Sequence, residues 1–169
     1  FLCRKNQPKE QKAVEINENY NLCVNPYPIL PEHVTLPYQE HIPQQIGHNF
    51  IEDIDALLKE MPEDYAIFYN GPCCGASAPD HFHFQGVLKK DVPLIAQYQR
   101  LRIGSQVLRY NSKLEEKKDF GTFCYYEESF RYIDKYTCPL FAFESNHTQL
   151  TFDLKEEIKP FAKAIGENE

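Results

Sequence analysis

The sequence predicts an α+β fold, on two observations. Short runs rich in β-branched and aromatic residues are typical of strands, and two longer segments repeat apolar residues at helical spacing. The chain has 169 residues, of which 42% are hydrophobic and 25% are charged, so it can bury a core of ordinary size. We therefore expect residues 1–169 to form a single domain. Because the chain begins at Phe1 and not at Met, we also expect part of its N-terminus to be missing.

The first extended segments are expected in the N-terminal quarter of the chain. Residues 20–30 have an extended pattern, and Pro26 and Pro28 place them at a sheet edge or in a loop, because proline has no backbone N–H to donate. Residues 33–36 form a short β-branched run that ends at Pro37, which predicts a strand.

A helix is expected at residues 49–61, where apolar side chains recur on one helical face. Asn49 is suited to cap its first turn, and Pro62 would end it. Residues 65–69 form a short apolar run, and residues 80–88 alternate between polar and apolar side chains. Both patterns predict strands.

The second half of the chain has weaker patterns. Residues 91–112 fit either a helix or a strand, and the charged run at residues 113–119 predicts a solvated loop or hairpin tip. Strands are expected at residues 122–126 and 140–143. Asp153 is a suitable N-cap for a final helix.

Charge and composition exclude several classes of partner. The chain has 18 Lys+Arg against 25 Asp+Glu, a net charge of −7, and nucleic acid is held mainly by Lys and Arg, so we expect no nucleic acid partner. No apolar stretch approaches the roughly 20 residues of a membrane span, so no membrane partner is expected. Six irregularly spaced cysteines are too few for a disulfide scaffold and predict a reduced, cytoplasmic protein.

The segment that carries chemistry is His81-Phe82-His83-Phe84-Gln85. Side chains alternate between the two faces of a strand, so His81, His83 and Gln85 are expected on one face and the two phenylalanines in the core. A His-x-His pattern also occurs on partly exposed sheet faces and at metal sites, and these alternatives stay open at this point.

A loop of small residues at 70–79 precedes this segment. Its backbone amides and the Ser77 hydroxyl could cradle a phosphate, because small residues let the backbone approach a ligand closely. A neutral imidazole beside such a loop can attack phosphorus and form a covalent phospho-imidazole intermediate. The spacing therefore favours phosphoryl chemistry.

Residues 81–85, together with the loop before them, resemble the histidine-triad (HIT) superfamily, and more narrowly its nucleotidyltransferase branch. That branch contains galactose-1-phosphate uridylyltransferase, ATP adenylyltransferase (diadenosine tetraphosphate phosphorylase) and the GDP-hexose phosphorylases. Residues 25–41 are similar to the family's Asn/Pro strand, its His-led strand and a second histidine about eight residues on. The resemblance covers about residues 20–90. It implies an antiparallel sheet with helices packed on one face.

The resemblance also implies roles for individual residues. His83, the middle residue of the triad, would be the nucleophile, and Gln85 would hydrogen-bond the phosphate of the intermediate. His81 is the first residue of the catalytic triad, and Asn25 would lie near the sugar or base of the nucleotide. The residues that would line the phosphate site are Asn70, Gly75 and Ser77. Asp80 departs from the uridylyltransferase pattern, in which proline is followed directly by histidine. This inserted residue could shift the loop.

Some members of the family bind structural zinc, and three matching ligands are present. They are Cys3, His41 and His81, and the fourth would be a cysteine immediately before Phe1. The alternative is that Cys3 is an ordinary thiol and that His81 is held by hydrogen bonds.

The expected function is a nucleotidyltransferase or phosphorylase that acts on a nucleoside diphosphate sugar or a dinucleoside polyphosphate. Its partners would be a nucleotide and a phosphorylated small molecule, and the resemblance also allows a homodimer. A HIT-type hydrolase would use water as the acceptor. Two alternatives from other classes are a cupin-like metal-dependent oxygenase and a non-catalytic nucleotide-binding module. The sequence leaves the base, the sugar and the acceptor open.

Overall fold

The computed structural model describes residues 2–46, 50–73, 76–103, 105–117, 122–133 and 140–145. The chain divides into two compact units, Phe1–Ala96 and Gln97–Glu169. Two such units can belong to one domain or to two, so the single domain expected over residues 1–169 stays a prediction.

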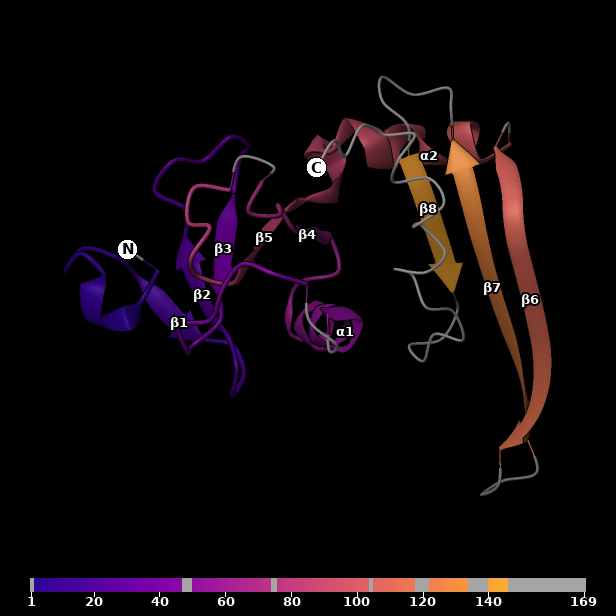
Figure 1. Cartoon of the computed structure of the whole chain (residues 1–169), viewed down its shortest axis with the longest axis horizontal. Coiled ribbons are helices and arrows are strands. Elements are labelled where there is room, and N and C mark those ends of the chain that lie inside the picture. Colours follow the sequence, from indigo (N-terminus) through magenta and orange to yellow (C-terminus); the bar gives the residue numbers. More distant parts are fainter. Residues whose placement is uncertain are drawn as a thin grey trace. The chain divides into compact units, whose positions relative to one another are not determined.

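Five described strands of the first unit form an antiparallel sheet in the order β1-β2-β3-β5-β4 (Figure 1). The strands are β1 (Ala13–Glu15), β2 (Asn21–Val24), β3 (Val34–Pro37), β4 (Tyr65–Phe68) and β5 (His83–Leu88). β5 pairs with both β3 and β4, so the strand that carries His83 lies inside the sheet and not at its edge. An antiparallel sheet with helices confirms the predicted α+β class.

The helical elements are η1 (Arg4–Asn6), α1 (Phe50–Glu60), η2 (Lys89–Asp91) and α2 (Pro93–Ile103). The predicted helix at residues 49–61 is thus confirmed as α1, while its expected cap Asn49 lies outside the described residues. α1 lies beside the sheet and contacts β4 (Figure 1). Among the described helices, none has the length and apolar character needed to cross a membrane.

The core lies between α1 and one face of the sheet. Leu57 of α1, Leu36 of β3 and Phe84 of β5 are fully buried in one cluster, which also contains Tyr20. Gly86 of β5 fits this layer because it has no side chain: an added Cβ would lie 2.8 Å from Cγ2 of Val34. The apolar residues of the strands, at alternate positions, therefore pack against the apolar residues of α1, at helical spacing. This is the packing that the two sequence patterns predict.

The second unit contains an antiparallel sheet of three described strands in the order β6-β7-β8. They are β6 (Gln106–Lys117), β7 (Thr122–Ile133) and β8 (Leu140–Ser145). The loop predicted at residues 113–119 is wrong for residues 113–117, which continue β6 and pair with β7. Strand pairing uses the backbone, so a charged run does not prevent it. The predicted final helix from Asp153 lies outside the described residues.

Candidate active site and metal centre

The polar side chains of β5 lie on the sheet face opposite the core. Because Phe84 is fully buried in the core cluster, strand alternation places His83 and Gln85 on the other face. Thr35 of β3 pairs with Gln85, and Pro37 pairs with His83, so β3 continues this face. The sheet therefore presents His83 and Gln85 side by side on one surface, as their spacing predicts.

His81 lies two residues before the start of β5, outside the strand. The predicted strand at residues 80–88 begins only at His83. The carbonyl of Phe82 still accepts from Tyr38 N–H (2.9 Å), in register with the β3–β5 pairing, but the N–H of Phe82 donates to Ile42 O in the loop after β3 (2.7 Å). His81 thus lies in the turn before β5, where its ring faces other partners.

The ring of His83 is held in one orientation and one tautomer. Its Nδ1 lies 2.8 Å from the carbonyl oxygen of His81, and a carbonyl only accepts, so Nδ1 carries the proton. The lone pair of the neutral ring is then on Nε2, which has no hydrogen-bond partner within the part of the chain that the structure describes. Burial lowers the pKa of His83, against the hydrogen bond to His81, which raises it. The ring is therefore neutral near pH 7, with Nε2 available as a nucleophile or base.

Gln85 is oriented by His33, to which the sequence analysis assigns no catalytic or binding role. The backbone N–H of Ile29 donates to Nδ1 of His33 (3.2 Å), so the proton of the neutral ring is on Nε2. This Nε2–H donates to Oε1 of Gln85 (2.8 Å), which leaves the Gln85 NH2 group for another acceptor. His33 is buried beside the ring of Phe68, with ring centroids 5.9 Å apart.

The signal that could have identified His33 is its position. It lies two residues before Thr35, so strand alternation places it on the same face as Gln85. Asn25 lies beside the same group: its Nδ2 is 3.3 Å from Nε2 of His33. Its Oδ1 accepts from Tyr27 N–H (2.8 Å) and thereby fixes the turn after β2.

The predicted phosphate loop is only partly brought to this site. The carbonyl of Asn70 lies near the backbone of His83, because one buried amide, Gln44, bonds both. Ser77 is exposed, and no hydrogen bond joins it to His83 or Gln85 in the described ranges. Gly75 lies outside the described residues.

Three predicted metal ligands meet next to this site. Sγ of Cys3 lies 3.0 Å from Nδ1 of His41 and 3.2 Å from Nδ1 of His81, and the two Nδ1 atoms are 3.3 Å apart. Ligand atoms around a tetrahedral zinc ion are roughly 3.3–3.6 Å apart, from the usual zinc–nitrogen and zinc–sulfur lengths. These three residues could therefore hold a metal ion.

The imidazole of His81 is also oriented by its other nitrogen atom. Nε2 of His81 donates to the carbonyl of Tyr38 (2.8 Å), which leaves the lone pair on Nδ1, towards the cluster. Nε2 of His41 lies 3.9 Å from Oδ2 of Asp80, so the inserted residue provides a nearby carboxylate. Metal-bound histidines usually have such partners on the nitrogen that does not bind the metal.

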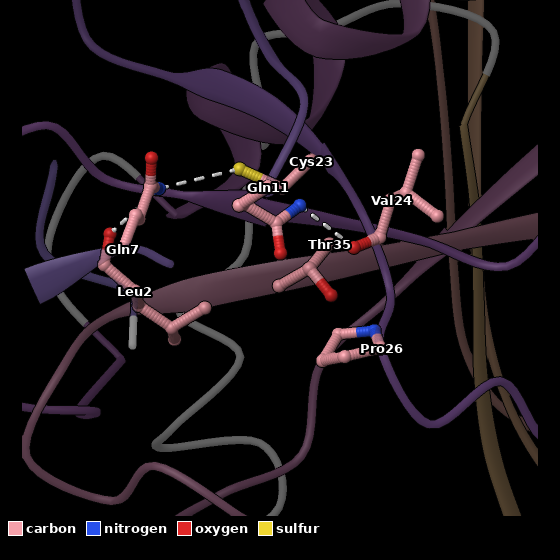
Figure 2. A pocket seen from close by; sticks show the side chains of 7 residues that line it. All are labelled: Leu2, Gln7, Gln11, Cys23, Val24, Pro26 and Thr35. Atoms are coloured by element: carbon pink, nitrogen blue, oxygen red, sulfur yellow. Dashed lines mark hydrogen bonds between the residues drawn. The ribbon is translucent and has the colours of Figure 1, made fainter. Parts of the chain in front are cut away.

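The N-terminal segment that carries Cys3 is anchored on β2 (Figure 2). Nε2 of Gln7 donates to Leu2 O (3.3 Å) and lies 3.6 Å from Sγ of Cys23, while Nε2 of Gln11 donates to Val24 O (3.0 Å). A small hollow remains between this segment and the strands. Its lining residues are Leu2, Gln7, Gln11, Cys23, Val24, Pro26 and Thr35. The glutamines thus hold the segment in the position that brings Cys3 to the two histidines.

The fold and the site together define an α+β protein in which a candidate metal centre lies next to a buried, oriented histidine. Residues 1–88 match the family described as Domain of unknown function (DUF4922). This match covers more than half of the 169 residues, so the chain belongs to that family. It includes every residue of the predicted site. No curated protein and no solved structure matches the chain.

Proposed function

We propose that this protein is a nucleotidyltransferase or phosphorylase of the histidine-triad type, with a covalent nucleotidyl-histidine intermediate on His83. The observation that carries the proposal is the orientation of this ring. Its Nδ1–H is bound to the carbonyl of His81, so Nε2 holds the lone pair. The proposed substrates are nucleoside diphosphate sugars or dinucleoside polyphosphates, because the resemblance to the nucleotidyltransferase branch implies them.

In the first step Nε2 of His83 attacks the α-phosphorus of the nucleotide. A P–N bond forms, and the P–O bond to the leaving group breaks, with its electron pair remaining on the departing oxygen. The ring gains positive charge in this step, and the carbonyl of His81 stabilises that charge by accepting from Nδ1–H. In the second step the oxygen of a phosphate-bearing acceptor attacks phosphorus, and Nε2 of His83 leaves with its lone pair restored.

Gln85 is proposed to bind the phosphoryl group through its NH2. His33 occupies Oε1 of Gln85 and so turns the amide hydrogens towards a ligand on this face. A neutral amide stabilises charge that develops on a phosphoryl oxygen without adding a counter-charge to the pocket. Such an arrangement would let a chain of net charge −7 bind a phosphate through a neutral amide and an imidazole.

We propose zinc as the ion of the Cys3, His41 and His81 cluster. One thiolate and two imidazoles are typical zinc ligands, and the three ligand atoms lie within a few tenths of an ångström of tetrahedral spacing. Zinc held there would have a structural role. It would tie the N-terminal segment to the loop after β3 and to the turn before β5.

The cupin-like alternative is not supported by this geometry. That alternative needs His81 and His83 as ligands of one ion. The ligand cluster found among the described residues contains His81 but not His83, whose Nδ1 is bound to a carbonyl. The expected homodimer and the cytoplasmic location stay predictions.

The test is covalent labelling. The protein is incubated with UDP-sugars, GDP-sugars and diadenosine polyphosphates that carry the label in the α-phosphate, and then quenched in alkali, where phospho-imidazoles survive. We expect labelled protein with at least one donor, no label on His83→Ala, and normal label on Lys59→Ala, an exposed residue of α1. A wild-type protein that no donor labels, or a His83→Ala variant labelled like the wild type, would contradict the proposal.

A further inference from the structure

Gln44, in the segment between β3 and α1, has a fully buried side chain whose hydrogen bonds converge on His83. Its Oε1 accepts from the backbone N–H of His83 (2.7 Å), and its Nε2 donates to the carbonyl of the same residue (3.0 Å). The second hydrogen of Nε2 is used by the carbonyl of Asn70 (2.9 Å). The side-chain amide of Gln44 thus forms hydrogen bonds through both N–H donors and its oxygen, and these bonds join the backbone at Asn70 to the backbone at His83.

The backbone of Gln44 is tied to the same region. Its N–H donates to the carbonyl of Pro79 (3.3 Å), and its carbonyl accepts from the hydroxyl of Tyr69 (2.9 Å). The loop at residues 70–79 therefore has a Gln44 hydrogen bond at its first residue, Asn70, and another at its last, Pro79. Gln44 links the two ends of the loop to the start of β5.

The strand register explains why an amide is needed at this place. β4 and β5 pair from Tyr65 and Leu88 to Phe68 and Gln85. If this ladder continued, Asn70 would face His83, but the pairing ends two residues earlier. A primary amide offers the same donor and acceptor as a peptide group. Gln44 takes the place of the missing ladder bonds where the two strands separate.

We propose that Gln44 is the positioning residue of the nucleophile. It fixes the backbone of His83 relative to the loop, while the carbonyl of His81 fixes the ring. Without the amide, the N–H of His83 and two carbonyls would be buried without their partner, and the start of β5 would shift to find others. The inference rests on the proposed function only in naming His83 as the nucleophile.

The first test uses substitution by an apolar residue of similar length. Gln44→Met removes all three side-chain hydrogen bonds, and Gln45→Met is the matched control, because Gln45 is the same residue type, adjacent and exposed. At saturating nucleotide donor, we expect the rate of His83 labelling to fall about 10- to 100-fold in Gln44→Met, because small displacements of a reacting group cost that much. The donor concentration at half-saturation should change by less than roughly threefold. The reason is that Gln44 is proposed to orient His83 and not to bind the donor.

A second readout does not depend on activity. Nitrogen-15 NMR of labelled histidines should show His83 of the wild type with the proton on Nδ1. In Gln44→Met we expect the two tautomers to exchange, while Gln45→Met keeps the wild-type signal. Bound metal should be equal in all three proteins, because none of the substitutions touches a proposed ligand.

These outcomes distinguish the proposed function from the positioning role of Gln44. If the wild type is never labelled, the proposed function fails, but a change of the His83 tautomer confined to Gln44→Met still supports the positioning role. If Gln44→Met does not fold, Gln44→Glu decides, because it keeps the length and the acceptor oxygen while a carboxyl oxygen, and the charge it brings, replaces the NH2 donor group. A folded Gln44 variant with the wild-type His83 tautomer and labelling rate would overturn the inference.

Discussion

The carbonyl oxygen of His81 accepts a 2.8 Å hydrogen bond from Nδ1 of His83. Since Nδ1 of the His81 ring lies in the cluster with Cys3 and His41, one residue links the candidate metal centre to the candidate nucleophile. A change that releases the ring of His81 will also move the carbonyl that orients His83. Loss of the metal ion should therefore also change the orientation of the His83 ring.

The first prediction concerns the metal. We expect about one zinc ion per chain, lost in Cys3→Ser, because the thiolate contributes one of the three ligands in the described residues. Cys73→Ser is the matched control, since Cys73 is exposed in the loop before β5. The measurement is metal content together with the absorption of the cobalt-substituted protein, whose thiolate-to-cobalt band should vanish only in Cys3→Ser.

Metal removal should also lower stability and reactivity. An ion present at 100 times its dissociation constant stabilises the folded state by about 2.7 kcal/mol. A chelator should therefore lower the thermal midpoint of the wild type and slow the labelling of His83. If Cys3→Ser retained the metal and the band, the assignment of this centre would be wrong.

The second prediction concerns the orientation of Gln85. His33→Ala removes the Nε2–H that occupies Oε1 of Gln85, so the amide can rotate and present its oxygen to the phosphoryl group. We expect labelling of His83 to slow by about tenfold, less than the roughly 100- to 1000-fold cost of deleting a transition-state donor, because the Gln85 amide itself is retained. Phe68→Leu is the control, because Phe68 contacts the His33 ring but makes no part of this hydrogen bond. Equal rates in His33→Ala and the wild type would contradict the role of His33.

The third prediction tests the packing behind β5. In Gly86→Ala the new Cβ would lie 2.8 Å from Cγ2 of Val34, the residue directly opposite on β3. We expect a loss of about 1–3 kcal/mol in the free energy of unfolding, as for other overpacked cores. Urea denaturation of Gly86→Ala, Val34→Ala and the double variant should show coupling, with the double variant more stable than the sum of the single effects. Additive effects would exclude the clash.

The fourth prediction concerns alkaline pH. Burial raises the pKa of Tyr20 well above its ordinary value, and its hydrogen bond to Asp53 (2.7 Å) raises it further. The folded state therefore keeps this phenol protonated, and the resulting stability is present below pH 10 and is lost as the pH rises above 10. At pH 7 we expect Tyr20→Phe to lose about 1.5–3 kcal/mol of unfolding free energy, the contribution of a hydrogen bond to a charged acceptor.

The measurement for Tyr20 is urea unfolding from pH 7 to pH 11. The difference between the wild type and Tyr20→Phe should become smaller above pH 10, because only the wild type has this phenol to titrate. Tyr27→Phe, at an exposed tyrosine, should follow the wild type throughout. A constant difference across this range would contradict the prediction.

Local patterns predicted much of the first unit. Alternation placed Phe84 in the core and His83 and Gln85 on the opposite face, and helical spacing located α1. The same pattern placed the start of this strand too early, because the N–H of Phe82 donates to Ile42 in the loop after β3 and not to a strand. A period of two residues describes a strand but contains no information about where a strand begins.

Contacts between distant segments could not be predicted from spacing. Gln44 lies 39 residues before His83 and looks like an ordinary polar loop residue, although its side chain is fully buried. His33 reaches Gln85 across 52 residues, and only the pairing of β3 with β5 reveals it. In β6, charged side chains suggested a solvated loop, whereas the backbone pairs with β7.

The most direct test of the central claim is to locate the nucleotide adduct. After incubation with the best nucleotide donor and an alkaline quench, tandem mass spectrometry of the peptide that contains both His81 and His83 should place the nucleoside monophosphate on one of them. We expect the adduct on His83, because its Nε2 carries the lone pair while both nitrogens of His81 are engaged. An adduct on His81, or on any residue outside this peptide, would contradict it.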